Sequence, residues 1–170
     1  PQPKYRCLVW ACPAHYYTNF TYWTQHCWGV TCVNDMEAML SYQPITIGDK
    51  EQALADLVRC YEKMMMRSHT NGGYVNLLDE CWKMCEKFHT NIVIMYDHVS
   101  CKNVGGLHGL FEDQARERGI HLIWIPHDVM DPRTVSRREM REAFSQYMVT
   151  VLNEKPLDPT LLDYEDTLSW

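Results

Sequence analysis

The sequence has no long apolar run, and this excludes a membrane-spanning helix among its segments. The longest runs, Ile92–Tyr96 and Leu122–Pro126, fall far short of the about 20 apolar residues that cross a bilayer. Runs of like charge are also missing, and the net charge is -6. A nucleic-acid-binding surface is normally basic, so we expect neither a nucleic-acid nor a membrane partner.

The start of the chain has neither a methionine nor the apolar stretch of a signal peptide. We therefore interpret the 170 residues as an internal segment of a longer protein. Without a sign of secretion, the eight cysteines are predicted to be thiols of a cytoplasmic protein, and metal binding by some of them stays open.

Strand-like and helix-like segments alternate along the chain, which predicts an α/β domain over 1–155 and a surface tail over 156–170. Such alternation is typical of a three-layer, mostly parallel sheet with helices on both faces. The expected strands are 5–11, one starting at 30–33, 91–99 and 120–125, and the expected helices are 19–27, 49–67, 78–88, one ending at Gly119, and 136–151.

Local signals support several of these helices. Ser136 and Glu139 form an S-x-x-E capping box, and Gly119 suits a left-handed helix end. Asn71-Gly72-Gly73 is expected to break the chain. One helical stripe of apolar residues consists of Leu54, Leu57, Val58, Tyr61, Met64 and Met65. The inward face of the last helix is expected to be Met140, Ala143, Phe144, Tyr147, Met148 and Val151.

Working residues of parallel sheets gather in loops beyond the carboxyl ends of the strands. Three loops qualify, 12–18, 98–106 and 126–136. The second is the most informative, because it places Cys101 between a strand and a helix start, where the helix dipole and Lys102 stabilise a thiolate. Gly105 and Gly106 allow the backbone to pass close to a bulky group. Cys101 is thus a candidate metal ligand or nucleophile, and a structural cysteine is the alternative.

Other candidates carry less specific patterns. Cys12 follows the first strand and could line a site, and His98 could hold the loop or donate to a ligand. Cys81 and Cys85 lie one helical turn apart, where core packing is favoured over a ligand pair. Asp131 and Arg133 are interpreted as a structural loop pair.

Three segments resemble the benzoyl-CoA reductase/2-hydroxyacyl-CoA dehydratase family. His98-Val99-Ser100-Cys101-Lys102 is similar to an H-x-x-C-K segment near the family's C-terminus. Residues 119–136 resemble the next block, in which a turn leads to a strand, an acidic D-x-x-D-x-R segment and a serine-capped helix; His121 replaces the usual proline. Residues 4–13 are similar to the strand that opens the family's second domain.

The resemblance implies a flavodoxin-like sheet forming the C-terminal half of a larger subunit. It also implies a [4Fe–4S] cluster held by cysteines of both halves, with Cys101 as the metal ligand from this half. Lys102, Gly105 and Gly106 would then contribute to cofactor binding, and His98, Ser100 and Cys12 to catalysis. Expected partners are a paralogous subunit, an acyl-CoA substrate and a cluster-bearing ATPase, since the sequence has no Walker motif.

Within the family, residues 131–136 and 147–151 look closest to ATP-dependent benzoyl-CoA reductase, which reduces an aromatic ring to a dienoyl-CoA. An (R)-2-hydroxyacyl-CoA dehydratase subunit is the first alternative, and a non-catalytic supporting subunit is the second. A free-standing flavin or nucleotide carrier rests on sheet topology alone.

Overall fold

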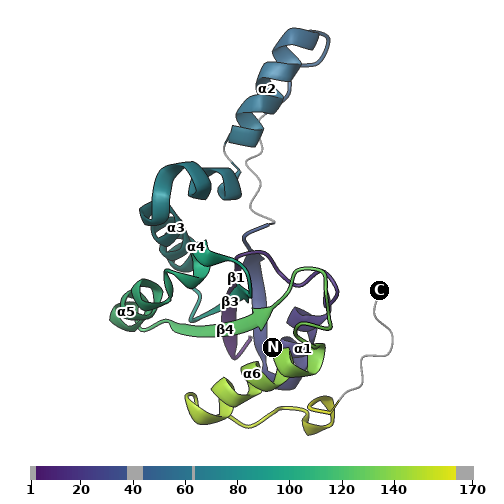
Figure 1. Cartoon of the computed structure of the whole chain (residues 1–170), viewed down its shortest axis with the longest axis vertical. Helices are drawn as coiled ribbons and strands as arrows, with labels where there is room; N and C mark the ends of the chain where they lie inside the picture. Colours follow the sequence, from purple (N-terminus) through teal and green to yellow (C-terminus); the bar gives the residue numbers. More distant parts are fainter. Residues whose placement is uncertain (1–2, 38–43, 63, 164–170) are drawn as a thin grey trace.

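The computed structural model describes residues 3–37, 44–62 and 64–163 and places a parallel sheet between helices (Figure 1). The four strands lie side by side in the order β2-β1-β3-β4, all parallel. This confirms the predicted α/β class. Their bounds are β1 Tyr5–Trp10, β2 Val30–Asp35, β3 Ile92–His98 and β4 His121–His127.

Helices cover both faces of the sheet, as predicted. On one face Phe20 of α1 meets Phe144 of α6, with ring centroids 5.8 Å apart. On the other, Phe111 of α5 contacts both Trp82 of α3 and Trp124 of β4. The helices are α1 Phe20–Trp28, α2 Lys50–Glu62, α3 Met65–Phe88, α4 Lys102–Gly105, α5 His108–Arg118 and α6 Arg137–Thr150, followed by a 3-10 turn, η1 Pro159–Leu161.

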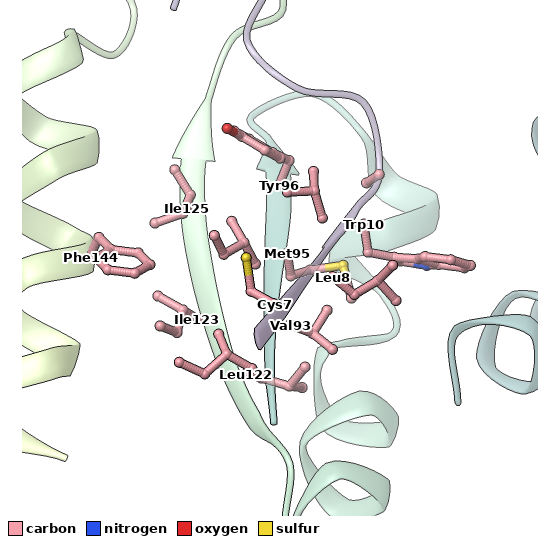
Figure 2. Packing of buried hydrophobic residues seen from close by; sticks show 14 of the residues in the cluster. Cys7, Leu8, Trp10, Val93, Met95, Tyr96, Leu122, Ile123, Ile125 and Phe144 are labelled. Carbon is pink, nitrogen blue, oxygen red and sulfur yellow. The ribbon is translucent and has the colours of Figure 1, made fainter. Parts of the chain in front are cut away.

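The central strand β3 has helices above and below it, and this explains its continuous apolar run. Every side chain from Ile92 to Tyr96 is at most 2% exposed. Figure 2 shows buried side chains on both sides of the strands, with Phe144 on one side and Trp10 on the other. Alternation of side chains along a strand therefore supplies two apolar layers from one short segment.

Two predicted helix ends are confirmed. Gly119 has φ 66° and ψ 28°, the left-handed conformation that glycine adopts without a Cβ clash. Ser136 and Glu139 form the reciprocal capping box, in which the Glu139 N–H donates to Ser136 Oγ and the Ser136 N–H donates to Glu139 Oε2 at 2.7 Å. The sequence pattern is enough here because both partners lie within four residues.

The single helix predicted over 49–67 is wrong. α2 ends at Glu62, and α3 begins at Met65, directly after Met64, whose φ and ψ are extended. The expected break at 71–73 is confirmed at Gly73, where φ is 73° and ψ 177°: the backbone leaves the helical conformation there, and α3 consists of two helical stretches joined by a kink. Glycine adopts a positive φ at little cost, so the chain bends without losing the helix on either side.

The apolar stripe of α2 does not face the core. Leu54, Leu57, Val58 and Tyr61 are 48% to 63% exposed, and α2 projects away from the sheet in Figure 1. The predicted inward position of Val151 is wrong, because that side chain is 55% exposed just beyond the end of α6. The periodicity of apolar residues predicts which side chains share one face of a helix. It does not predict whether another element covers that face.

The residues after α6 return along α1. The Leu157 N–H donates to the Cys27 carbonyl at 2.7 Å, and Trp23 Nε1 donates to the Leu161 carbonyl at 2.9 Å. Residues 164–170 of the predicted tail lie outside the described residues. Among the described helices, none is both long and apolar enough to cross a membrane.

Candidate functional site

The sheet order creates a crevice at the carboxyl ends of β1 and β3. From β1 the chain crosses to β2 on one side, and later returns to β3 on the other. Loops that leave two adjacent parallel strands in opposite directions open a gap between them, and such gaps commonly bind ligands. The predicted loops 12–18, 98–106 and 126–136 meet here, and the His15 N–H donates to the Val129 carbonyl at 2.8 Å.

A pocket of about 340 Å³ occupies this crevice. Its wall is mainly apolar, and its polar groups come from the ends of β1 and β3, from α3 and from α4. Its volume is within the usual range for small-molecule sites. The lining residues are Ala11, Cys12, Met36, His69, Leu77, Tyr96, His98, Cys101, Asn103, Val104 and Val129.

Cys101 lies on the pocket wall at the N-cap of α4, where the sequence places it. Its N–H donates to the His98 carbonyl at 2.8 Å, and its own carbonyl accepts from Gly105. The thiol is partly exposed. α4 has only four residues, so its dipole is weaker than that of a full helix. The position therefore presents a reachable thiol to the pocket.

His98 and Ser100 are brought together at the start of this loop. Nδ1 of His98 accepts from the Ser100 N–H at 3.1 Å and lies 3.0 Å from Ser100 Oγ. Because Nδ1 accepts, neutral His98 carries its proton on Nε2, which lies 3.9 Å from Asp128 Oδ2. The bond braces the turn that carries Cys101.

His127, at the end of β4, lies behind this histidine and was missed by the sequence patterns. Its ring is fully buried, with its centroid 5.5 Å from that of His98 and 5.0 Å from that of Tyr96. Neither ring nitrogen makes a hydrogen bond of normal geometry among the described residues. Burial lowers the pKa of His127 and the charge of His98 lowers it further, while nearby carbonyl groups, first that of Cys12, weakly oppose this.

Cys12 reaches the pocket through an unusual backbone turn. Ala11 has φ 65°, a left-handed conformation that costs a non-glycine residue about 1–2 kcal/mol. The Cys12 thiol donates to Glu37 Oε1 at 3.1 Å and lies 3.8 Å from His15 Nε2. Burial, the hydrogen bond to Glu37 and its charge raise the pKa of Cys12 to about 12.

The other predicted cofactor-binding residues lie away from the pocket wall. Lys102 and Gly105 of α4 are exposed, as is Gly106, which follows the helix, and a Cβ added at Gly105 would meet no atom within 4 Å. His108, also near the loop, stacks on Trp124 at 3.7 Å between centroids. A role for the α4 residues in cofactor binding stays a prediction.

Two interpretations of residue pairs are confirmed. Arg133 donates to Asp131 from Nε at 2.8 Å and from Nη2 at 2.6 Å, and the pair lies within its own exposed loop. That bidentate contact lowers the pKa of Asp131 to about 2. Cys81 and Cys85 are at most 2% exposed and pack in the core under the sheet.

The cysteines fit a shared cluster better than a complete one. Iron–sulfur clusters are held by about four thiolates. Among the described residues, only Cys12 and Cys101 bring a thiol to the pocket wall, while Cys7, Cys27, Cys81 and Cys85 are buried in the core. Cys32 pairs with Cys7 across β1 and β2. Two thiols are fewer than a cluster requires, so any cluster held at this pocket would need ligands from elsewhere.

Comparison with known proteins adds a family relationship. A family model described as "2-hydroxyglutaryl-CoA dehydratase, D-component" matches residues 1–148, which include every strand and the pocket wall. No curated protein matches the sequence.

Proposed function

Because the chain belongs to the 2-hydroxyglutaryl-CoA dehydratase D-component family, whose members are subunits of acyl-CoA dehydratases and reductases, we propose that it is part of an iron–sulfur enzyme acting on acyl-CoA thioesters. The finer proposal is ATP-dependent reduction of the benzoyl-CoA ring. Family subunits act with a paralogous subunit and an activator. For this chain we propose a cluster-bearing ATPase as the activator, and a cytoplasmic location.

One observation carries the proposal: the partly exposed thiol of Cys101 lies on the wall of a mainly apolar pocket at the carboxyl edge of the sheet. A thiol in such a place can meet both a metal centre and a bound acyl group. The cysteines of the core cannot, because their side chains are sealed between sheet and helices.

The lining of the pocket favours an uncharged acyl group. Its described wall contains Met36, Leu77, Val104 and Val129 and contains neither lysine nor arginine. A benzoyl ring would be stabilised by contact with these side chains, whereas the second carboxylate of a hydroxyglutaryl group would lose hydration and meet no lysine or arginine on this wall. The reductase is therefore proposed ahead of the dehydratase.

The chain's own residues would bind the cluster and shape its surroundings. Cys101 would supply one ligand, and Ser100 and His98 would hold the loop in place through the bonds at His98 Nδ1. The Nε2 proton of neutral His98 could be donated to the ligand or to a cluster sulfur. Cys12 would line the acyl side of the pocket. When bound, the cluster would supply low-potential electrons.

The first test compares the intact, full-length complex with its Cys101→Ser variant in anaerobic iron and acid-labile sulfide analysis. We expect the variant to lose about one cluster's worth of iron, together with thioester-dependent activity. Cys60→Ser is the matched control, since Cys60 is also partly buried but belongs to α2, away from the pocket. Unchanged iron and activity in Cys101→Ser would contradict the proposal and favour a non-catalytic supporting subunit.

A second measurement separates the two reactions. A reductase consumes electrons in every turnover, whereas a dehydratase requires them only for activation. With a limiting amount of reductant, product formation should stop in proportion to the electrons supplied. Continued turnover after the reductant is exhausted would replace the reductase by the dehydratase.

A further inference from the structure

Three metal-binding side chains converge at the edge of the pocket, and neither the proposed cluster nor the family relationship accounts for them. They are Cys12 and His15, from the loop after β1, and Glu37, from the loop after β2. Their donor atoms all lie within 4.8 Å of one another. We infer that Cys12, His15 and Glu37 form a binding site for a divalent transition-metal ion, with zinc as the best fit. This inference does not rest on the proposed function.

The distances suit a single ion. Zinc binds sulfur at about 2.3 Å and nitrogen or oxygen at about 2.0–2.2 Å, so two donors of a tetrahedral site lie about 3.3–3.6 Å apart. Cys12 Sγ is 3.1 Å from Glu37 Oε1 and 3.8 Å from His15 Nε2. His15 and Glu37 are both exposed, so small side-chain rotations suffice to close the site.

The donor types select the metal. Magnesium and calcium prefer oxygen ligands alone, whereas a thiolate, an imidazole and a carboxylate together suit zinc. Three protein ligands leave a fourth position open, which is the arrangement of reactive rather than structural zinc sites. Since Cys12 also lines the pocket, that position would be available to water or to an oxygen atom of a pocket ligand.

The tertiary fold builds this site. Cys12 and His15 are held in one short turn after Ala11, whose backbone has a positive φ. Glu37 directly follows Met36, whose N–H donates to the Val9 carbonyl at 3.0 Å and anchors the end of the β2 segment beside β1. Without a metal ion, the Cys12 thiol donates a hydrogen bond to Glu37. Zinc would replace that proton, forming the Sγ–Zn bond and releasing one proton to the buffer.

The site is tested with zinc alone. The intact complex, as purified with its cluster, is dialysed anaerobically against ⁶⁵Zn²⁺, and X-ray absorption at the zinc edge identifies the ligands. We expect one zinc ion per chain with one sulfur neighbour at about 2.3 Å. Outer-shell partners of metal ligands contribute about 10–100-fold in affinity, so loss of a direct ligand in Cys12→Ser should weaken binding by at least about 100-fold.

Matched variants keep the test decisive. His15→Ala removes an exposed ligand, so it should fold normally and still lose zinc, whereas His26→Ala removes an exposed histidine of α1 and should not. Cys101→Ser should keep its zinc and His15→Ala should keep its iron, which separates this site from the proposed cluster. Equal zinc binding by wild type and both ligand variants would overturn the inference. A zinc spectrum without sulfur, or loss of iron in His15→Ala, would do the same.

Discussion

At the scale of single residues, the pocket depends on two histidines in different surroundings. His98 is partly exposed and uses Nδ1 to hold the Cys101 loop. His127 is fully buried behind it, so its neutral form is favoured in the folded protein. A neutral His127 keeps positive charge away from the proposed proton donor, His98.

His127→Phe is expected to reduce the loss of stability in mild acid. The folded-state pKa of His127 lies below its ordinary value of about 6.5, so the unfolded chain takes up the proton first as the pH falls. Its stabilising contribution is therefore present above about pH 6.5 and is lost as the pH falls toward the folded value, by about 1.4 kcal/mol for each unit of pKa difference. Urea unfolding of the full-length subunit across this range measures the effect.

The phenylalanine variant should show a shallower pH dependence than wild type, while some slope remains because burial also lowers the pKa of His69. His26→Phe, at an exposed position, is the control and should leave the slope unchanged. An identical slope in wild type and His127→Phe would show that His127 does not titrate in this way.

At the scale of secondary-structure elements, α2 and α3 have similar apolar periodicity but different surroundings. Leu78 of α3 is 3% exposed beneath the sheet, whereas Leu57 of α2 is 48% exposed on a helix that projects from the domain. Asp56 nevertheless holds the start of this segment, because it accepts from the Thr46 N–H and hydroxyl at 3.0 and 2.8 Å. Local polar contacts stabilise α2 where packing does not.

Truncation of each of these two leucines should show that the loss of stability depends on how tightly the side chain is packed and not on its position in an apolar stripe. Leu78→Ala is expected to lower the free energy of unfolding by about 2–5 kcal/mol, because it removes buried methyl groups and leaves a cavity. Leu57→Ala should change it by less than about 0.5 kcal/mol, as at other exposed positions. Urea unfolding of the full-length subunit measures both. A comparable loss in Leu57→Ala would show that the α2 stripe is covered by residues outside those described.

At the scale of the whole molecule, the fold buries some cysteine thiols and leaves others accessible from the pocket. Cys7, Cys27, Cys81 and Cys85 lie inside the core, whereas Cys101 lines the pocket. A parallel sheet covered on both faces seals its strands and leaves only the loop edge open to ligands. Chemistry is therefore confined to that edge.

Alkylation of the metal-free, folded full-length subunit should show that cysteines react at different rates according to their burial. Cys101 should react readily, and the four core cysteines only after unfolding. Cys12 should react slowly although it is partly exposed. Its pKa of about 12, against an ordinary 9.0, reduces the thiolate fraction at neutral pH about 1000-fold. Mass spectrometry after a short exposure to iodoacetamide measures each site. Rapid labelling of Cys81 or Cys85 would contradict the described core.

The sequence by itself determined features that depend on neighbours along the chain. The capping box at Ser136, the helix end at Gly119, the buried strand β3 and the placement of Cys101 after that strand all follow from local patterns. The alternation of elements was sufficient to predict a parallel sheet with helices on both faces, because few topologies satisfy the crossover rules. The meeting of the three loops followed from that topology.

Only the tertiary structure decided which side chains meet across the sheet. Glu37 was overlooked because the second strand extends to Asp35, so its following loop was not counted among the site loops. His127 gave no signal, since burial behind His98 depends on the pairing of β3 with β4. The exposure of the α2 stripe gave no signal either, because periodicity marks an apolar face whether or not anything covers it. Contacts between distant segments form only where the sheet order places them side by side, and no local pattern records that order.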